Sequence, residues 1–125
     1  MTEKLEIYKC NICGNVVQVL LNGVGDLVCC GENMEHLEPQ FKKDELGEKH
    51  VPEIYEEEGK KWVKLTKHPM TNEHYIQLIE AFSEDKTEMR LKYFCPEQNP
   101  DFDITGFDSS CAIELCNIHK LWRNK

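Results

Sequence analysis

Four cysteines within the first 30 residues constrain the fold of this chain more than any other feature. Cys10 and Cys13 are separated by two residues, and Cys29 and Cys30 are adjacent. The segment that carries them is about 36 residues long, and chains below about 40 residues usually need a metal, disulfides or oligomerisation to fold. A bound metal ion therefore has a structural reason to be present in this segment.

The start of the chain favours free thiolates over disulfides. Met1 to Glu6 contains two acidic residues and no apolar run that leads to a small-residue cleavage site, so we expect a cytoplasmic protein. A reducing cytosol keeps disulfides open, and the seven cysteines cannot all pair. We interpret the cysteines as candidates for metal binding or redox chemistry. Cys95 and Cys111 have no assigned role and are expected to be free thiols, with a redox disulfide between them as the alternative.

Charge and hydropathy exclude two classes of partner. The chain has 15 Lys and Arg against 23 Asp and Glu, a formal net charge of −8, and no basic cluster that would bind a nucleic-acid backbone. Its longest apolar stretch, Val16 to Leu21, is interrupted by Gln18 and falls far short of the about 18 residues that a membrane span needs. We therefore expect a soluble protein with neither nucleic-acid nor membrane partners.

The two kinds of candidate ligand lie in different parts of the chain. Four cysteines come before residue 31, whereas four of the five histidines come after residue 49. Between them, Leu37 to Gly47 mixes charged residues with Pro39 and shows little apolar periodicity, as is typical of a connection. We predict a boundary near residue 38, with one domain over residues 1–37 and a second over residues 38–125.

Both parts show the pattern of β structure. In the first, we expect strands around a reversal at Asn22 to Gly25, over Leu5–Lys9, Val16–Leu21 and Asp26–Cys29. In the second, runs of β-branched and aromatic residues between turn-formers predict an all-β sandwich with strands over Val51–Tyr55, Lys61–Leu65, His74–Ile79, Met89–Tyr93 and Ala112–Leu115. The run from Tyr75 to Phe82 is also compatible with two helical turns, and we favour the strand.

The spacing of the first four cysteines has a direct chemical meaning. Two residues between Cys10 and Cys13 let both sulfurs face one ion, and Gly14 lets backbone amides turn toward them. Four thiolates suit tetrahedral zinc or a mononuclear iron centre. Because the adjacent Cys29 and Cys30 cannot both adopt the angles of a relaxed two-residue knuckle, the tetrahedron should be distorted, which favours iron.

A second group of metal-ligand types lies in the later part of the chain. Cys116 and His119 have a spacing that can bring one thiolate and one imidazole to the same ion. Three further imidazoles, from His50, His68 and His74, would complete a set of five ligands with one open position, as a reactive metal site requires.

Two other interpretations of these residues remain open. A blue-copper-like electron carrier uses two His, one Cys and a weak axial Met, but no Met follows His119. A zinc-stabilised interaction module would use the four N-terminal thiolates to hold the fold and would leave the later histidines without a role.

The combination of motifs resembles desulfoferrodoxin, the two-iron form of superoxide reductase. The resemblance covers essentially the whole chain and rests on the four N-terminal cysteines together with Glu48-Lys49-His50-Val51-Pro52, His68-Pro69-Met70 followed by His74, and Cys116-Asn117-Ile118-His119. It implies a small desulforedoxin-like domain that holds iron in four thiolates. It also implies an immunoglobulin-like β-sandwich that holds a second iron, with Cys116 as the axial ligand and four equatorial histidines, His50, His68, His74 and His119.

The resemblance also implies an activity. The second iron would reduce superoxide to hydrogen peroxide by one electron without forming oxygen, and would thereby protect an anaerobe from oxidative damage. Lys49 would attract superoxide and help to deliver protons through water, and Glu48 would bind the ferric ion once peroxide has left. The expected electron donor is a rubredoxin-like carrier, and the expected assembly is a homodimer formed through the small first domain.

Three residues outside these motifs carry weaker expectations. Trp62 and Trp122 are expected to be core anchors or a lid over the metal, because large aromatic side chains dominate core packing. His36 belongs to none of the motifs and is expected at the surface.

Overall fold

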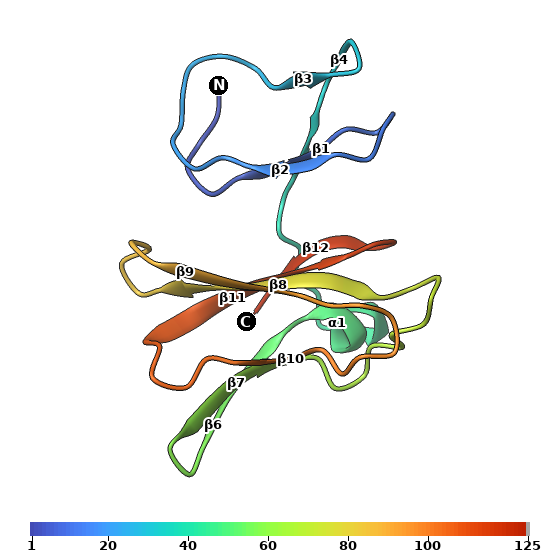
Figure 1. Cartoon of the computed structure of the whole chain (residues 1–125). Coiled ribbons are helices and arrows are strands. Elements are labelled where there is room, and N and C mark those ends of the chain that lie inside the picture. Colours follow the sequence, from blue (N-terminus) through green and yellow to red (C-terminus); the bar gives the residue numbers. More distant parts are fainter. Residues whose placement is uncertain (125) are drawn as a thin grey trace. The chain divides into compact units, whose positions relative to one another are not determined.

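The computed structural model describes residues 1–124 of the chain. By its internal contacts the chain divides into two compact units, the first spanning Met1–Glu38 and the second beginning at Pro39 (Figure 1). Each unit has its own sheets, and each is described separately below. Within the described residues, no helix has the length and apolar character that crossing a membrane requires.

The first unit consists of two very small antiparallel sheets. β1 (Ile7–Lys9) lies between β2 (Val16–Gln18) and β5 (Glu35–Leu37), and β3 (Val28–Cys29) pairs with β4 (Glu32–Asn33). The predicted strands appear here in shortened form as β1, β2 and β3, whereas β4 and β5 were not predicted. The buried apolar side chains among residues 1–38 are few, namely Ile7, Cys10, Val19 and Leu37. So small a core agrees with a segment that needs a metal in order to fold.

The second unit is a sandwich of two antiparallel sheets (Figure 1). One sheet has the order β10 (Asp101–Asp103), β7 (Lys60–Lys64), β6 (Glu53–Glu57). The other has the order β12 (Lys120–Arg123), β11 (Ser109–Cys116), β8 (Ile76–Ser83), β9 (Met89–Tyr93). The core between them takes residues from both sheets, among them Val63, Phe102, Ile79, Ala81 and Ala112. The prediction of an all-β architecture with a β-sandwich is confirmed.

The strand interpretation of residues 75–82 is also confirmed, and the helical alternative is wrong. β8 pairs along its length with β11 on one side and with β9 on the other. These two ladders satisfy the backbone N–H and C=O groups of β8 in the extended conformation. The local sequence is compatible with a helix or a strand, and pairing with the neighbouring strands selects the strand. β10 and β12 were not predicted, because DFD and KLWR are too short to give a clear strand pattern.

One helix, α1 (Glu45–His50), occupies a region that the sequence analysis assigns in part to a connection. The Asp44 side chain caps its first turn by accepting a hydrogen bond from the Gly47 backbone N–H at 2.9 Å. The helix ends at His50, and its C-cap Val51 is extended and stands directly before a proline, as is usual. A Cβ atom on Gly47 would lie only 1.8 Å from the carbonyl oxygen of Lys42, so this glycine permits close packing of the helix rather than marking a loop.

Two candidate metal centres

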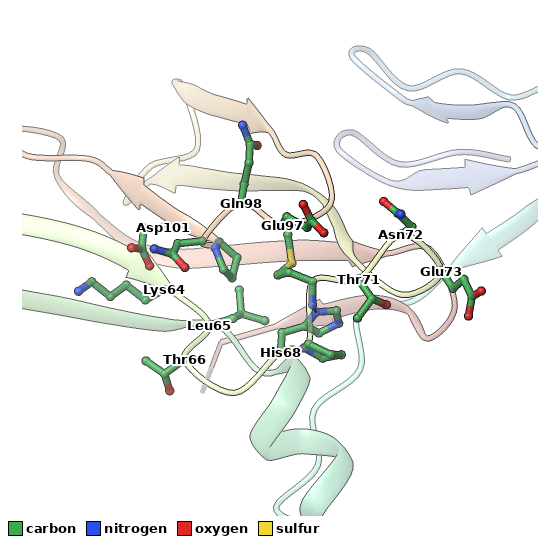
Figure 2. Close-up of a pocket in the computed structure, with 14 residues that line it drawn as sticks. Lys64, Leu65, Thr66, His68, Thr71, Asn72, Glu73, Glu97, Gln98 and Asp101 are labelled. Atoms are coloured by element: carbon green, nitrogen blue, oxygen red, sulfur yellow. Dashed lines mark hydrogen bonds between the residues drawn. The ribbon is translucent and has the colours of Figure 1, made fainter.

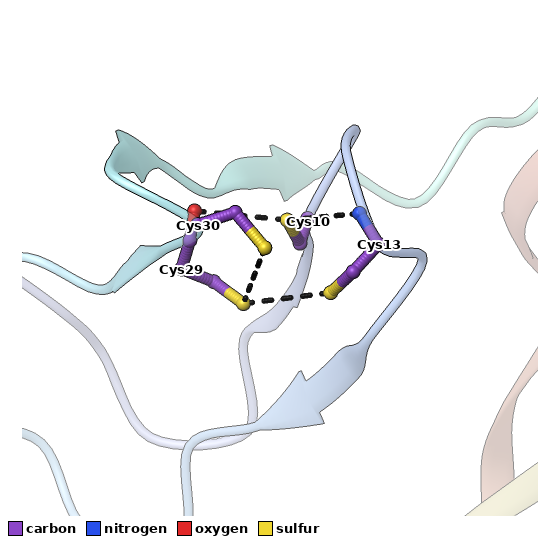
Figure 3. Close-up of side chains that lie close together, drawn as sticks. All are labelled: Cys10, Cys13, Cys29 and Cys30. Atoms are coloured by element: carbon purple, nitrogen blue, oxygen red, sulfur yellow. Dashed lines mark hydrogen bonds between the residues drawn. The ribbon is translucent and has the colours of Figure 1, made fainter.

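The four N-terminal cysteines converge on one point in the first unit (Figure 3). Their sulfur atoms all lie within 4.8 Å of one another. The Cys13 and Cys29 sulfurs are 3.6 Å apart, and those of Cys29 and Cys30 are 4.0 Å apart. The structure therefore assembles the four thiol groups that the sequence predicts as one ligand set.

Left-handed backbone conformations shape the two cysteine turns. Gly14 and Gly31, which each follow a cysteine pair, have φ values of 86° and 78°. Cys30 is itself left-handed, with a φ of 55°, a conformation that a residue with a side chain rarely adopts. This conformation lets two adjacent cysteines face the same centre, a geometry that a relaxed knuckle does not provide.

The Cys10 and Cys30 thiols ionise at different pH. Backbone hydrogen bonds from Cys13 and Ile12 lower the pKa of Cys10 to about 6. Contacts with the sulfurs of Cys13 and Cys29 raise the pKa of Cys30 to about 12. A metal ion that binds all four sulfurs must therefore displace protons that the site otherwise keeps at neutral pH.

The second centre draws its residues from three segments of the second unit. His50 is the last residue of α1, His68 and His74 lie between β7 and β8, Cys116 ends β11, and His119 lies in the turn before β12. One potential ligand atom from each of His50, His74, Cys116 and His119 lies within 4.8 Å of the others. The sandwich thus brings together residues that are far apart in the sequence.

His68 borders this group of four. Its Nε2 atom is 3.5 Å from the Cys116 sulfur, and its ring centroid is 4.5 Å from that of His74. Figure 2 shows His68 on the wall of an open polar groove formed by residues 64–66, 68–73 and 97–101. The role of His68 as a fourth imidazole ligand remains a prediction.

The His50 side chain carries the clearest sign that this group suits a metal. Its Nδ1 atom lies 2.8 Å from the Leu46 carbonyl oxygen, which can only accept, so Nδ1 carries the proton. Its Nε2 atom is buried without a hydrogen-bond partner among the described residues. A buried lone pair without a partner is costly, and a metal ion would satisfy it while the Leu46 carbonyl holds the ring's tautomer.

Burial sets the protonation of this centre. Desolvation lowers the pKa of His50 to about 4 and that of His68 to about 3, and it also lowers the pKa of His74. These imidazoles are therefore neutral at pH 7 and able to act as ligands. Burial raises the pKa of the Cys116 thiol, whereas hydrogen bonds from the backbone N–H groups of His119 and Ile118 lower it by less. Metal binding would displace that proton.

Trp122 and Trp62 were both expected to be core anchors or a lid over the metal, and they differ in burial. Trp122 is fully buried, stacks on the His50 ring at 5.0 Å and donates from Nε1 to the His119 carbonyl at 2.9 Å. It is a core anchor that supports the second centre. Trp62 is only half-buried, with the Lys64 ammonium 4.9 Å from its ring centroid, so the expectation is wrong for this residue.

The predicted catalytic pair lies on the exposed side of α1. Glu48 and Lys49 are both exposed, and the Lys67 Nζ is 3.3 Å from the Glu48 carboxylate. Burial, then His119, then Lys49 lower the pKa of His74, so the charge of Lys49 acts on the cluster. The contacts of Lys67 and of the Leu46 carbonyl were not predicted, since nothing in the sequence marks them.

The remaining residues belong to neither group of ligands. Cys95 is exposed and Cys111 is half-buried, and both have free thiols. His36, expected at the surface, is half-buried, lies 3.2 Å from the Glu6 carboxylate and stacks on Tyr8 at 5.1 Å.

Comparison with known proteins agrees with this arrangement. The family model described as desulfoferrodoxin, N-terminal domain, matches residues 2–37, and the model described as desulfoferrodoxin matches residues 42–125. The four-cysteine group and the group of three histidines with Cys116 match the two iron centres that the resemblance implies.

Individual relatives span the whole chain. A desulfoferrodoxin homolog from Archaeoglobus fulgidus is 42% identical, and a desulfoferrodoxin from Desulfarculus baarsii is 40% identical, over 99% and 98% of both chains respectively. The solved structure of a superoxide reductase from Treponema pallidum has a TM-score of 0.75 and 21% identity over 99% of this chain and 100% of its own, which shows a shared fold. Both parts of the sequence and its full length are thus accounted for, and the chain belongs to the desulfoferrodoxin family.

Proposed function

We propose that this chain is a superoxide reductase, which converts superoxide to hydrogen peroxide with one electron and two protons and without forming oxygen. One observation carries the proposal. Three imidazoles and the Cys116 thiol lie with ligand atoms within 4.8 Å of one another, and the buried Nε2 of His50 lacks a hydrogen-bond partner among the described residues. Membership of the desulfoferrodoxin family supports the same activity.

Two sets of residues would hold iron. Cys10, Cys13, Cys29 and Cys30 would hold one ion, and Cys116 with His50, His68, His74 and His119 would hold the other. Bound in the second set, iron supplies the single electron by alternating between its ferrous and ferric forms. Thiolate and neutral imidazole ligands suit this metal, and the thiolate increases the electron density available to it. We assign the two sets to domains over residues 1–37 and 38–125.

Lys49 is the residue that we assign to capture of the substrate anion. The whole chain carries a net charge of −8, which repels superoxide at long range. Lys49 stands exposed beside His50 and places a positive charge where the substrate arrives. Its ammonium group also orders water through which the two protons reach the product.

Glu48 is the residue that we assign to closing the site after peroxide has left. Its carboxylate is paired with Lys67 at 3.3 Å, and both side chains are 62% exposed. Exposed ion pairs of this kind contribute only about 0–1 kcal/mol, so Glu48 can leave Lys67 at little cost.

The same proposal includes an electron donor and an oligomeric state. A reduced rubredoxin-like protein in the cytoplasm of an anaerobe is the electron donor that we assign. We further propose a homodimer formed through the first unit, where Leu20, Leu21 and Val24 expose 69%, 84% and 89% of their surface. Exposed apolar residues on so small a unit favour association with a second copy.

Counting products tests the activity. The iron-loaded, anaerobically reduced protein is mixed with a known dose of superoxide, and the peroxide and oxygen formed are measured. We expect one peroxide for each superoxide and no oxygen. Half a peroxide per superoxide with oxygen released faster than by spontaneous decay would indicate dismutation. If superoxide loss is not accelerated, the remaining interpretations are an electron carrier or a zinc-stabilised interaction module.

A further inference from the structure

We infer that Asn117 is a positioning residue, which fastens the segment carrying His74 to the turn carrying Cys116 and His119. The inference rests on the proposed function only in so far as these residues form a metal site. Asn117 belongs to no predicted ligand set, and its side chain is half-buried at the end of β11. Its role is to bring two ligand-bearing segments into register before any ion binds.

Three hydrogen bonds carry the inference. The Asn117 backbone N–H donates to the Tyr75 carbonyl at 3.1 Å, and its side-chain Oδ1 accepts from the Tyr75 backbone N–H at 2.9 Å. Its Nδ2 donates to the Glu73 carbonyl at 3.0 Å. Glu73 and Tyr75 flank His74 in the sequence, so Asn117 holds the backbone on both sides of that histidine.

The place of Asn117 in the sheet explains why a side chain is needed. β11 and β8 pair in register from Cys111 to Leu115, between one irregularity at Ser109/Cys111 and a second at Leu115/Cys116, after which Cys116 pairs with Ile76. Asn117 extends this ladder by one more residue, and its side-chain carbonyl supplies the acceptor that Tyr75 needs. The ladder thus continues to the edge of the metal cluster.

The position of His74 depends on this connection. Among the described residues its own backbone bonds to Thr71 in the nearby turn, where its N–H donates to the Thr71 hydroxyl at 3.1 Å and to the Thr71 carbonyl at 3.3 Å, and its carbonyl accepts from the Thr71 N–H at 2.8 Å. Those contacts lie within the same loop. The bonds of Asn117 tie the backbone of this loop to the turn of His119, whose Nδ1 lies 3.1 Å from the His74 Nε2.

The amide group suits both bonds at once, because it offers an acceptor and a donor on one short side chain. Aspartate would keep the acceptor for Tyr75 but would place an oxygen against the Glu73 carbonyl. Alanine would remove both bonds. Groups that orient metal ligands in this way typically change metal affinity by about 10–100-fold when they are removed.

The experiment compares Asn117→Ala with Asn72→Ala in the full chain loaded with ferrous iron. Asn72 is an exposed residue of the same loop and serves as the matched control. After competition with a chelator the protein is oxidised, and the iron that remains at each site is measured by the thiolate-to-iron absorption of its ferric form. We expect Asn117→Ala to weaken iron binding at the His and Cys116 site by about 10–100-fold, with the four-cysteine site and Asn72→Ala unchanged. Equal binding by Asn117→Ala and wild type would overturn the inference.

A second variant, Asn117→Asp, decides the matter if the alanine variant does not fold. The added negative charge by itself would tighten the binding of a cation, whereas loss of the bond to Glu73 weakens it. Weaker binding therefore supports positioning, and unchanged or tighter binding contradicts it.

A measurement without metal separates this inference from the proposed function. In the metal-free protein, we expect Asn117→Ala to speed amide hydrogen exchange at His74 at least tenfold, although that N–H bonds to Thr71 and not to Asn117. An unchanged rate would contradict the inference whether or not iron binds. Conversely, faster exchange together with no superoxide reduction by the wild type would remove the proposed function and leave the role of Asn117 in place.

Discussion

The two candidate centres are built in opposite ways. The cysteines of the first unit come from two short turns, and Cys13 and Cys30 are exposed. In the second unit, His50 and Cys116 are almost fully buried and come from α1 and β11, which are distant in the sequence. In the first case the ligands hold the small unit together, whereas in the second a packed sandwich holds the ligands. The two centres should therefore respond differently to the same perturbation.

Removal of metal should give the largest difference between the units. We expect chelation to unfold the first unit, whose few buried apolar side chains cannot balance the entropy of ordering the chain, and to leave the sandwich folded. Amide hydrogen exchange would show loss of protection in β1 and β5 with protection kept in β8 and β11. Protection of all four strands in the metal-free protein would contradict this view of the first unit, and restored metal is the control.

Single ligand substitutions should separate the centres by activity. We expect Cys116→Ser to lower superoxide reduction by at least about 100-fold and to remove the thiolate-to-iron absorption of the second site, since loss of a ligand exceeds the usual effect of an outer contact. Cys13→Ser should instead disturb only the first centre and its unit. Absorption spectra and superoxide kinetics of both variants measure this. An unchanged second-site spectrum in Cys116→Ser would exclude Cys116 as a ligand.

A substitution remote from the metal should affect only the packed centre. Gly47→Ala places a Cβ 1.8 Å from the Lys42 carbonyl, so α1 must shift together with His50. We expect the second unit to lose about 1–3 kcal/mol of unfolding free energy and its metal site to bind more weakly. Gly25→Ala, which meets open space, is the control. Urea unfolding and chelator competition measure both effects, and equal behaviour of the two variants would show that α1 tolerates the shift.

Loss of the exposed charge beside the second centre should have a kinetic effect only. We expect Lys49→Ala to slow superoxide capture about tenfold at low salt and to reduce its salt dependence, with iron still bound. Stopped-flow measurements over a range of ionic strength would test this, with Lys60→Ala at the start of β7 as the control. A rate that is unaltered and still salt-sensitive would place the steering charge elsewhere.

Acid should lower the unfolding free energy of the metal-free second unit. The pKa of His50 is lowered to about 4 in the folded protein, from an ordinary value of 6.5, so the unfolded chain binds the proton first. Unfolding free energy should therefore fall as the pH decreases from about 6.5 to about 4. Urea unfolding of the metal-free protein across this range checks the sign, and His50→Gln should reduce the dependence, to which the lowered pKa values of His68 and His74 contribute with the same sign. A stability that rises with acid would contradict the buried, neutral state of His50.

The parts of the fold that could be predicted are those with a local signal. Residues Met89–Tyr93 form a strand with the predicted bounds, and the all-β pattern of the second unit is correct. The helix α1 was missed because Gly47 marks a loop more often than a helix, and only its contact with Lys42 explains its place there. β12 was missed because its four residues become a strand by pairing with β11.

The sequence by itself determined the chemistry of both centres. The short spacing of Cys10 and Cys13, in a segment too small for a core, indicates a metal because covalent geometry alone keeps these two sulfurs close. The types and motifs of the later histidines and Cys116 likewise indicate a second ligand set. Neither conclusion needs knowledge of how distant segments pack.

Only the tertiary structure decided how the second centre is assembled. The register of β8 with β11 brings His74 to Cys116, the packing of α1 leaves the Nε2 of His50 buried without a hydrogen-bond partner among the described residues, and Asn117 joins the two loops. Burial in turn keeps the imidazoles of His50 and His68 neutral. These properties depend on distances between residues far apart in the chain, and such distances are set by sheet register and core packing rather than by local spacing.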